Sequence, residues 1–286
     1  MRVANLSGRL VLVHEVGGEP RAIDVERHSD GRFSSDPQAV YDQWEAFLRW
    51  ARGVAADGEP FAPTLLGAPV PGPRQVFAIG LNYHAHAVEA GYDEPTGELP
   101  VFTKFVTSIG GPFGEIELPP DGHTDWEVEL VAVMARRTYR VTAADALDYV
   151  AGYTVGQDIS ERRLQMAATP AQFSLGKSFP GFAPMGPWLV TADAIGDPGE
   201  LELRCRIDGE TVQSGHTSQL IFSVPALIAR LSAVLPLLPG DVIFTGTPAG
   251  VGLGRTPPRY LRPGEVLETA IDGIGTMRHT MVRARP

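Results

Sequence analysis

The sequence predicts a mainly β protein with short helices, in the α+β class. Short apolar runs bounded by turn residues recur along the chain, as in residues 76–80 (VFAIG) and 241–246 (DVIFTG), and such runs are typical of strands. Helical patterns are few and do not alternate regularly with strands, so a doubly wound parallel sheet is not expected. The 286 residues are enough for one large domain, or for a large and a small one.

The first part of the chain, residues 1–72, is expected to form a small N-terminal α/β domain. Residues 1–34 show short strand patterns separated by turns, and residues 34–53 predict a helix that Ser35 or Asp36 can cap. The apolar stripe of this helix is formed by Val40, Trp44, Phe47, Leu48 and Ala51. The Pro- and Gly-rich residues 58–75 indicate a linker, so we place the boundary near residue 72 and the second domain at residues 73–286.

The second domain is predicted to consist of strands joined by tight turns, with two helices. Strands are expected over residues 76–80, 126–135, 241–246 and 266–282, the last range turning at Asp272-Gly273. A hairpin is expected over residues 201–215, because the Asp208-Gly209 pair favours a two-residue β-turn. Helices are expected over residues 142–152 and from Pro225 to residue 235.

Composition and charge exclude several classes of function. A net charge of −10 argues against general binding to nucleic acid or to membrane surfaces. No apolar run approaches the roughly 20 residues needed to span a bilayer, and the N-terminus lacks the features of a signal peptide, so a cytoplasmic protein is expected. The single cysteine, Cys205, excludes an internal disulfide and is expected to be a packing residue. The chain has only two lysines, Lys104 and Lys177, which hints that a compact ammonium group is needed at those places.

Residues 124–133 (TDWEVELVAV) place two glutamates inside an apolar strand pattern. Side chains two residues apart on a strand share a face, so Glu127 and Glu129 point the same way while Trp126 and Val128 point the other way. Two like charges on one face repel each other, and burying either without a partner is costly. Three arrangements would stabilise the pair: a solvated face, neutralisation by Arg or Lys, or shared binding of a cation.

A third carboxylate, Asp158 in GYTVGQDIS, follows another strand pattern. Together with the two glutamates it would supply three oxygen ligands, a set that Mg²⁺, Mn²⁺ and Ca²⁺ prefer. Zinc is less expected, because no suitably spaced His or Cys pair accompanies these residues. The alternative for Asp158 is the cap of a turn or helix.

His86 and Glu89 in GLNYHAHAVEAG are three residues apart. If this segment is helical they share a face, and a His–Glu pair can take a proton from water. The alternative is an exposed helical turn, just as Lys177 in LGKSFPGF can be a solvated loop residue. The Gly-rich residues 245–254 are not followed by a helix, so a nucleotide-binding loop is not expected there, and a sharp turn or close approach of the backbone explains them better.

Taken together, these segments resemble the fumarylacetoacetate hydrolase family over roughly residues 76–282. The resemblance rests on motifs in the family's order: GLNYHAHAVE, DWEVEL, GYTVGQDISERRLQ, LGKSF, PMGPWLV, QSGHTSQLIF, LLPGDVIFTGTPAGVG and YLRPGEV. It implies a mixed β-roll with a small N-terminal domain, usually assembled as a homodimer, and a site for Mg²⁺ or Mn²⁺, with Ca²⁺ as a further occupant in crystals.

The resemblance also implies roles for individual residues. The metal ligands would be Glu127, Glu129 and Asp158. The catalytic residues would be His86 and Glu89, as a water-activating pair, and Lys177 beside the metal. The substrate-binding residues would be Arg162, Gln165 and Thr247. Two positions depart from the common pattern, Pro180 where Asp is frequent and His216 where Asn is frequent, and either departure can alter the choice of substrate.

The function implied by this resemblance is hydrolysis of the C–C bond of a 2,4-diketo acid of the acylpyruvate type. The oxo acid would chelate the metal through its carboxylate and 2-oxo oxygens, and the His86–Glu89 pair would activate the attacking water. The alternatives are decarboxylation of oxaloacetate or isomerisation of a 2-hydroxy-diene-dioate through the same enolate. A lesser alternative is a non-catalytic protein that binds an oxo acid.

Overall fold

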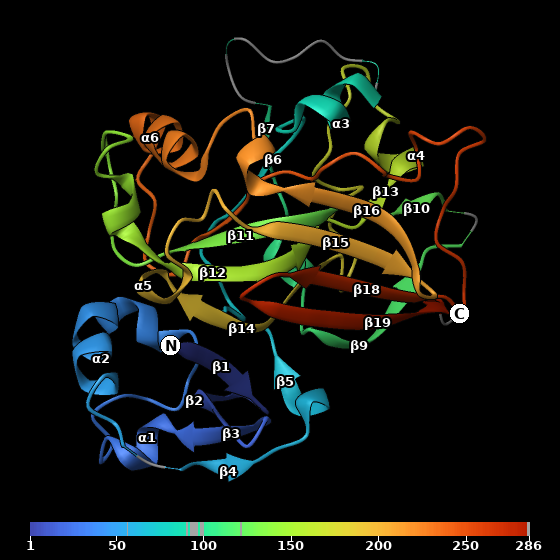
Figure 1. The fold of residues 1–286 in the computed structure, drawn as a ribbon. Coiled ribbons are helices and arrows are strands. Elements are labelled where there is room, and N and C mark those ends of the chain that lie inside the picture. The colour runs from blue at the N-terminus through green and yellow to red at the C-terminus, as the bar shows by residue number, and fades with distance from the viewer. Residues whose placement is uncertain (56, 90, 92–96, 98–99, 121, 285–286) are drawn as a thin grey trace.

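The computed structural model describes the whole chain except residues 56, 90, 92–96, 98–99, 121 and 285–286 (Figure 1). It is mainly β with short helices, as the sequence predicts. The helices are α1 (Val25–His28), α2 (Trp44–Ala51), α3 (His84–Glu89), α4 (Arg162–Gln165), α5 (Ala192–Ile195) and α6 (Val224–Val234). Short 3-10 turns lie at Ala39–Gln43, Pro63–Leu65, Val106–Ser108, Ala146–Tyr149 and Thr217–Gln219. None of the described helices is long and apolar enough to cross a bilayer.

The largest sheet joins twelve of the described strands, ordered β4-β3-β2-β1-β14-β12-β11-β17-β6-β7, with β5 beside β1 and β8 beside β14. Its strands are β1 (Arg2–Leu6), β2 (Arg9–Val16), β3 (Glu19–Asp24), β4 (Glu59–Pro60), β5 (Leu66–Gly67), β6 (Val76–Ile79), β7 (Val101–Thr103), β8 (Ile109–Gly110), β11 (Val128–Met134), β12 (Val150–Gln157), β14 (Ala183–Thr191) and β17 (Val242–Phe244).

A second sheet has the order β16-β15-β18-β19-β9, and β10 pairs separately with β13. These strands are β9 (Phe113–Leu118), β10 (Thr124–Asp125), β13 (Ser160–Glu161), β15 (Glu202–Ile207), β16 (Glu210–His216), β18 (Val266–Ile271) and β19 (Gly275–Arg283). Figure 1 shows the second sheet lying across β11 and β12, so the centre of the molecule is a packed pair of sheets.

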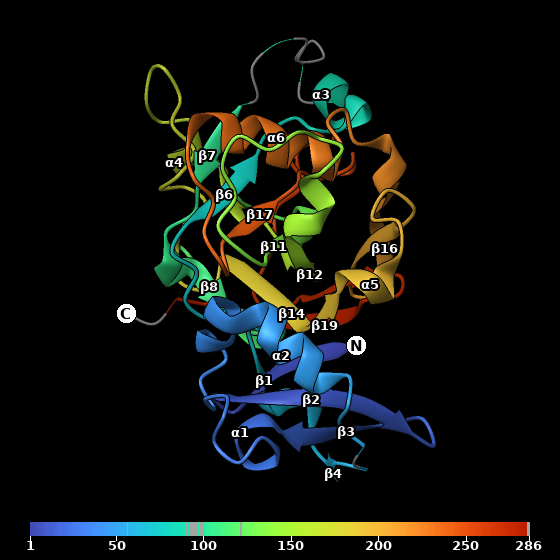
Figure 2. The same ribbon diagram turned by 90° about the vertical axis from the view of Figure 1, so that its left-hand side faces the viewer.

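The N-terminal strands and α2 form a distinct group that adjoins β14 (Figures 1 and 2). The helix predicted over residues 34–53 is present as a 3-10 turn followed by α2, and its apolar stripe packs Trp44 and Phe47 into a buried cluster. Strand β1 pairs antiparallel with β14, with Arg2 opposite Val190, so the sheet runs on from this group into the rest of the chain. A domain boundary near residue 72 stays a prediction.

Strand β11 presents two faces of different character, as the period-2 pattern predicts. Trp126 and Leu130 belong to the core beneath the second sheet, whereas Val131 and Val133 belong to the cluster on the opposite side. Glu129 shares the face of Val131 and Val133, because alternate residues of a strand point the same way. The strand begins at Val128 and not at residue 126, so Glu127 lies just ahead of its first residue.

The predicted turns are confirmed and one predicted helix is wrong. Asp208 and Gly209 both have positive φ, 50° and 85°, as the tight β15–β16 hairpin requires. Helix α6 has Pro225 in its first turn. Residues 142–152, however, form only a 3-10 turn and then enter β12, which is held between β11 and β14 in the middle of the large sheet. The pairing partners of a central strand therefore override a weak local helix pattern.

Candidate active site

Three buried carboxylates meet where β11 and β12 run side by side. Val128 lies opposite Gln157 in the antiparallel register, and the Asp158 N–H donates to the Glu127 carbonyl (2.9 Å). This register brings one ligand atom from each of Glu127, Glu129 and Asp158 within 4.8 Å of the others. Their exposed fractions are 5%, 1% and 1%, so the interpretation of a solvated glutamate face is wrong.

Cations neutralise one side of this cluster. Lys177 Nζ lies 2.7 Å from Glu127 Oε2 and 2.6 Å from Asp158 Oδ2. Arg162 Nη2 lies 2.7 Å from Glu127 Oε1, on the other oxygen of the same carboxylate. Lys104 Nζ lies 2.6 Å from Asp158 Oδ1 and also donates to the Lys177 carbonyl. Glu127 and Asp158 thus each receive two cationic groups.

This arrangement shifts the pKa values of Glu127, Glu129, Lys104 and Lys177. Burial by itself would raise the pKa of Glu127, but Lys177 and Arg162 outweigh it and hold that pKa far below its usual value. Burial raises the pKa of Glu129, and the neighbouring carboxylates of Asp158 and Glu127 raise it further. Burial lowers the pKa of Lys104, whereas Asp158 and Glu127 raise that of Lys177 despite its burial.

The donor set fits a hard divalent cation. All three groups are carboxylates, and Glu129 receives the Gly246 N–H (2.8 Å) without any described cation at ion-pair distance. An excess of buried negative charge is costly unless a cation offsets it. The residues that would hold Mg²⁺ or Mn²⁺ are therefore the three that the sequence singled out.

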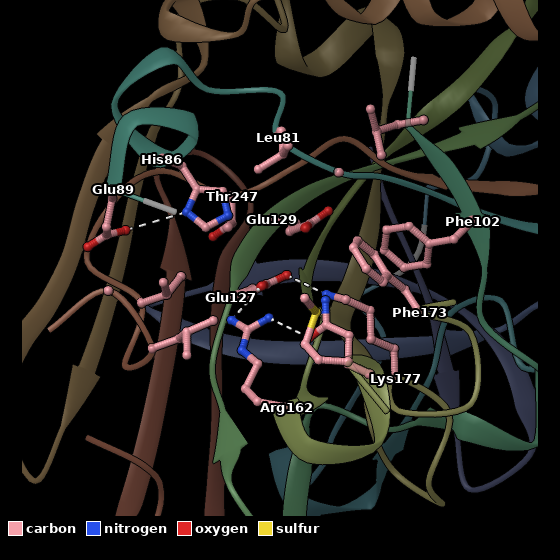
Figure 3. Close-up of a pocket in the computed structure, with 17 residues that line it drawn as sticks. Leu81, His86, Glu89, Phe102, Glu127, Glu129, Arg162, Phe173, Lys177 and Thr247 are labelled. Carbon is pink, nitrogen blue, oxygen red and sulfur yellow. Dashed lines mark hydrogen bonds and ion pairs between the residues drawn. The ribbon is translucent and has the colours of Figure 1, made fainter. Parts of the chain in front are cut away.

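His86 and Glu89 lie on α3 beside this cluster (Figure 3). The His86 Nδ1 atom is 3.4 Å from Glu89 Oε2, so the predicted i, i+3 contact is present. The Gly250 N–H donates to both carboxylate oxygens of Glu89 (3.0 and 3.1 Å), which anchors the helix end to the Gly-rich segment. His86 is only 8% exposed, so the alternative of an exposed helical turn is wrong for this side chain.

Glu127 and Glu129 of this cluster and the His–Glu pair line one cavity of about 310 Å³. Figure 3 shows His86 and Glu89 on one side of the glutamates, and Phe102 and Phe173 on the other. The remaining lining residues are Ile79, Gly80, Leu81, Arg162, Gln165, Met166, Lys177, Thr247, Val251, Leu253 and Gly254.

Every predicted site residue except Asp158 lines this cavity, and Asp158 contacts the lining residue Lys177 at 2.6 Å. Arg162 donates from Nη1 to Gln165 Oε1 (2.9 Å), so these two side chains are linked. The Thr247 hydroxyl donates to the Val128 carbonyl (2.9 Å) and accepts from Gln213 (2.8 Å). The two departures from the common pattern, Pro180 and His216, are not among the lining residues, and Cys205 is buried in the core.

Two further buried charges take part in the site and were not assigned a role from the sequence. Lys104 was noted only as one of two lysines. Asp125 accepts from Arg162 Nε (2.9 Å) and from the N–H groups of Gly252 (2.7 Å) and Leu253 (2.9 Å). Asp125 therefore ties the Gly-rich segment to the arginine that holds Glu127. The scarcity of lysine pointed to Lys104, whereas nothing in the local sequence distinguished Asp125 from a surface residue.

Comparison with known proteins places the chain in a family. Residues 75–282 match the model of the fumarylacetoacetate (FAA) hydrolase C-terminal domain. The human mitochondrial oxaloacetate tautomerase FAHD2A is 42% identical over 246 residues, which cover 84% of this chain and 78% of that protein. A 2,4-didehydro-3-deoxy-L-rhamnonate hydrolase of a Sphingomonas species is 42% identical over 224 residues, covering 78% of this chain and 76% of the relative.

Crystal structures of related proteins share the whole fold. A Mycobacterium smegmatis protein provisionally named HpcE has a TM-score of 0.93 at 51% identity, covering 100% of both chains. The maleylpyruvate hydrolase of Sphingobium sp. SYK-6, in complex with manganese(II) and pyruvate, has a TM-score of 0.79 at 29% identity, again covering 100% of both chains. Together, the motif order, the mixed β architecture and these matches show that the chain belongs to the fumarylacetoacetate hydrolase family.

Proposed function

We propose that the protein is a metal-dependent hydrolase that cleaves the C–C bond of a 2,4-diketo acid. The observation that carries this proposal is the shared cavity: a His–Glu pair able to activate water opens onto the same space as Glu127 and Glu129, and one oxygen of Asp158 lies within 4.8 Å of theirs, which completes a carboxylate set suited to Mg²⁺ or Mn²⁺. The bound cation would supply Lewis acidity toward the carboxylate and 2-oxo oxygens of the substrate. The manganese and pyruvate held by the maleylpyruvate hydrolase support this choice of cofactor class and ligand chemistry.

His86 would act as the general base. Glu89 is placed to accept a hydrogen bond from Nδ1–H, which leaves Nε2 as the proton acceptor on the other side of the imidazole ring. Because the Gly250 N–H donates to Glu89 and holds this carboxylate in place, the imidazole of His86 is oriented before substrate arrives. A water deprotonated by Nε2 would attack the C4 carbonyl, and the C3–C4 bond would then break to release an acid and the enolate of pyruvate.

The cationic side chains would bind and stabilise charge. Lys177 uses two of its three N–H donors on Glu127 and Asp158, and its ammonium lies 5.0 Å from the centre of the Phe102 ring, at the edge of the cavity. Its third donor would stabilise negative charge that develops on substrate oxygen. Arg162 and Gln165 would contact an oxygen of the substrate, and Thr247 would lie near the substrate carboxylate.

Two measurements test the proposal. Cleavage of acylpyruvates is expected to stop when EDTA removes the metal and to return with added Mg²⁺ or Mn²⁺. The His86→Ala variant is expected to lose about two to four decades of turnover, the usual loss for a general base. The control is His84→Ala, which changes a histidine of the same helix that does not line the cavity. Near-full activity of His86→Ala on an acylpyruvate would refute the assigned base.

A second candidate function is keto–enol tautomerisation of oxaloacetate, favoured by the named activity of the human relative. The same site could also decarboxylate oxaloacetate or isomerise a 2-hydroxy-diene-dioate, since each reaction passes through an enolate. Following the enol absorbance of oxaloacetate, together with pyruvate release, separates these reactions from hydrolysis. A protein that only binds oxo acids would leave every substrate unchanged.

We also propose that the protein works as a cytoplasmic homodimer on a small-molecule oxo acid. The family resemblance supports the dimer. The location stays a prediction from the N-terminal sequence, and the human relative is named as mitochondrial. Gel filtration with light scattering tests the dimer.

A further inference from the structure

The part of the cavity beyond the charged cluster is apolar, and this bears on the substrate. Building on the proposed function, we propose that the substituent beyond C4 of the substrate is uncharged and apolar, and that a second carboxylate at that position is rejected. This would separate the protein's specificity from that of enzymes that act on diene-dioates or maleylpyruvate.

The lining residues outside the predicted catalytic, substrate-binding and metal-ligand residues are apolar or glycine. Phe102 and Phe173 meet edge to face, with ring centres 5.6 Å apart, and form one wall (Figure 3). Met166 and Leu253 keep 48% and 41% of their surface exposed although they line the cavity. An apolar tail would cover these side chains and gain free energy in proportion to the apolar area removed from water. A carboxylate in the same place would lose its hydration without a compensating partner.

Each lining Lys or Arg of the described chain already contacts two carboxylates, and the remaining donor of Lys177 is the one assigned above to the reacting oxygen of the substrate. Arg162 contacts Asp125 and Glu127, and Lys177 contacts Glu127 and Asp158, each within 2.9 Å. His86 faces Glu89.

The formal charges of the site leave no surplus for a second anion. Among the residues that the structure describes, the charged network at the cavity joins five carboxylates to three cations of Lys or Arg type. The carboxylates are Glu89, Asp125, Glu127, Glu129 and Asp158, and the cations are Lys104, Arg162 and Lys177. A divalent cation would cancel the remaining two negative charges, and the first carboxylate of the substrate would then make the site negative. A second carboxylate would enter against like charge.

The donors near Gln165 suit a neutral oxygen. Gln165 Oε1 accepts from Arg162 Nη1, so the amide is oriented with its Nε2 donor directed elsewhere. The amide N–H of Gln165 can donate a hydrogen bond to the neutral carbonyl oxygen at C4. It cannot neutralise a carboxylate, and the charge of Arg162 is already offset by Asp125 and Glu127. The site is therefore equipped for a ketone at C4 followed by an apolar tail.

The decisive experiment compares two substrates of matched length, pentanoylpyruvate and succinylpyruvate, with the Mn²⁺-loaded enzyme. The kcat/KM for pentanoylpyruvate is expected to exceed that for succinylpyruvate by on the order of 100-fold, because the polar end has no partner. Comparable values, or a preference for succinylpyruvate, would overturn the inference while leaving the hydrolase function intact.

A binding measurement keeps the inference testable if neither compound is cleaved and the proposed function fails. Calorimetric titration of the Mn²⁺-loaded protein with 2-oxohexanoate and 2-oxoadipate compares an apolar and an anionic end at the same chain length. Tighter binding of 2-oxohexanoate, by about tenfold or more, is expected, and equal or tighter binding of 2-oxoadipate contradicts the inference.

A supplied cation should reverse the selectivity. Met166→Arg is expected to raise the ratio of succinylpyruvate to pentanoylpyruvate kcat/KM by about tenfold, since it adds a partner for the second carboxylate. Leu253→Arg serves as a second variant should the first fold poorly. Leu164→Arg is the matched control, because Leu164 lies two residues away, is 39% exposed and does not line the cavity. An equal change in the Leu164→Arg control would argue against the proposed contact.

Discussion

Replacing Lys104 by methionine isolates the contribution of one buried charge to this site. Lys104 is 1% exposed, and its ammonium contacts Asp158 Oδ1 at 2.6 Å as well as the carbonyls of Ile159 and Lys177. Methionine has a similar length and leaves no large cavity, so the change removes mainly the charge and its hydrogen bonds. Asp158 would keep only Lys177 as a cationic partner.

The expected loss of stability is about 3–5 kcal/mol in EDTA, the usual result of removing one partner of a buried ion pair. The matched control is Arg52→Met, which breaks the Arg52–Asp193 pair at 3.0 Å. That pair is about half exposed, with side-chain exposures of 57% and 50%, and pairs of this kind contribute about 0–1 kcal/mol.

Urea unfolding followed by tryptophan fluorescence measures both variants against the parent chain. Saturating magnesium is expected to recover part of the Lys104→Met loss, because a divalent cation at the carboxylates would replace the missing positive charge, and it should leave the Arg52→Met difference unchanged. If Lys104→Met costs no more than Arg52→Met in EDTA, or if magnesium has the same effect on both, the assigned role of Lys104 is wrong.

Three other substitutions test separate parts of the structure. Burial lowers the pKa of His279 from 6.5 to about 4, so as pH falls the unfolded chain takes up a proton on this imidazole before the folded chain does. The free energy of unfolding should therefore fall by about 3 kcal/mol between pH 6.5 and pH 4. His279→Gln should flatten that part of a pH-dependent unfolding curve. Gly252→Ala should lose about 1–3 kcal/mol in chemical denaturation and also lower kcat/KM, because its Cβ would overlap the Arg259 carbonyl and press on Asp125. Glu129→Gln should weaken Mn²⁺ binding by at least about tenfold in calorimetry without destabilising the metal-free protein, since it removes a buried charge that lacks a described cationic partner.

The strands and turns of this fold could be predicted because their signals are local. The alternation around Glu129 placed Val131 and Val133 on its face, and the Asp208-Gly209 pair marked the hairpin turn. The helix predicted over residues 142–152 is wrong because its last residues belong to β12, which pairs with the separate strands β11 and β14. Local propensity contains no information about such partners.

The site was predictable in part for the same reason. Two glutamates at i and i+2 of a strand are known to share a face from their spacing alone. The groups that surround them, however, come from residues about 30 to 50 positions away in the sequence. Only the register of β11 with β12 shows that Asp158 reaches Glu127, and only the folded chain brings Lys177 to both carboxylates. The family resemblance identified these residues as a set. It did not identify Asp125, whose contacts with Arg162 and the Gly252 N–H depend on three separate segments.

The distribution of buried charge explains why these three carboxylates suit a cation while remaining compatible with a stable fold. Glu127 and Asp158 have lysine or arginine partners on both of their oxygens, so most of their burial cost is offset without any ion. Among the described residues, Glu129 has only a backbone donor, the Gly246 N–H, and no cation at ion-pair distance. Its pKa is raised by burial and by its two acidic neighbours. A divalent ion would therefore gain most from Glu129, and the other two carboxylates would add ligand oxygens that the fold already holds in place. Because the cations that hold them are themselves fixed by Asp125 and the Ile159 carbonyl, the arrangement exists before the ion binds, which is the condition for a site that orients a substrate as well as a metal.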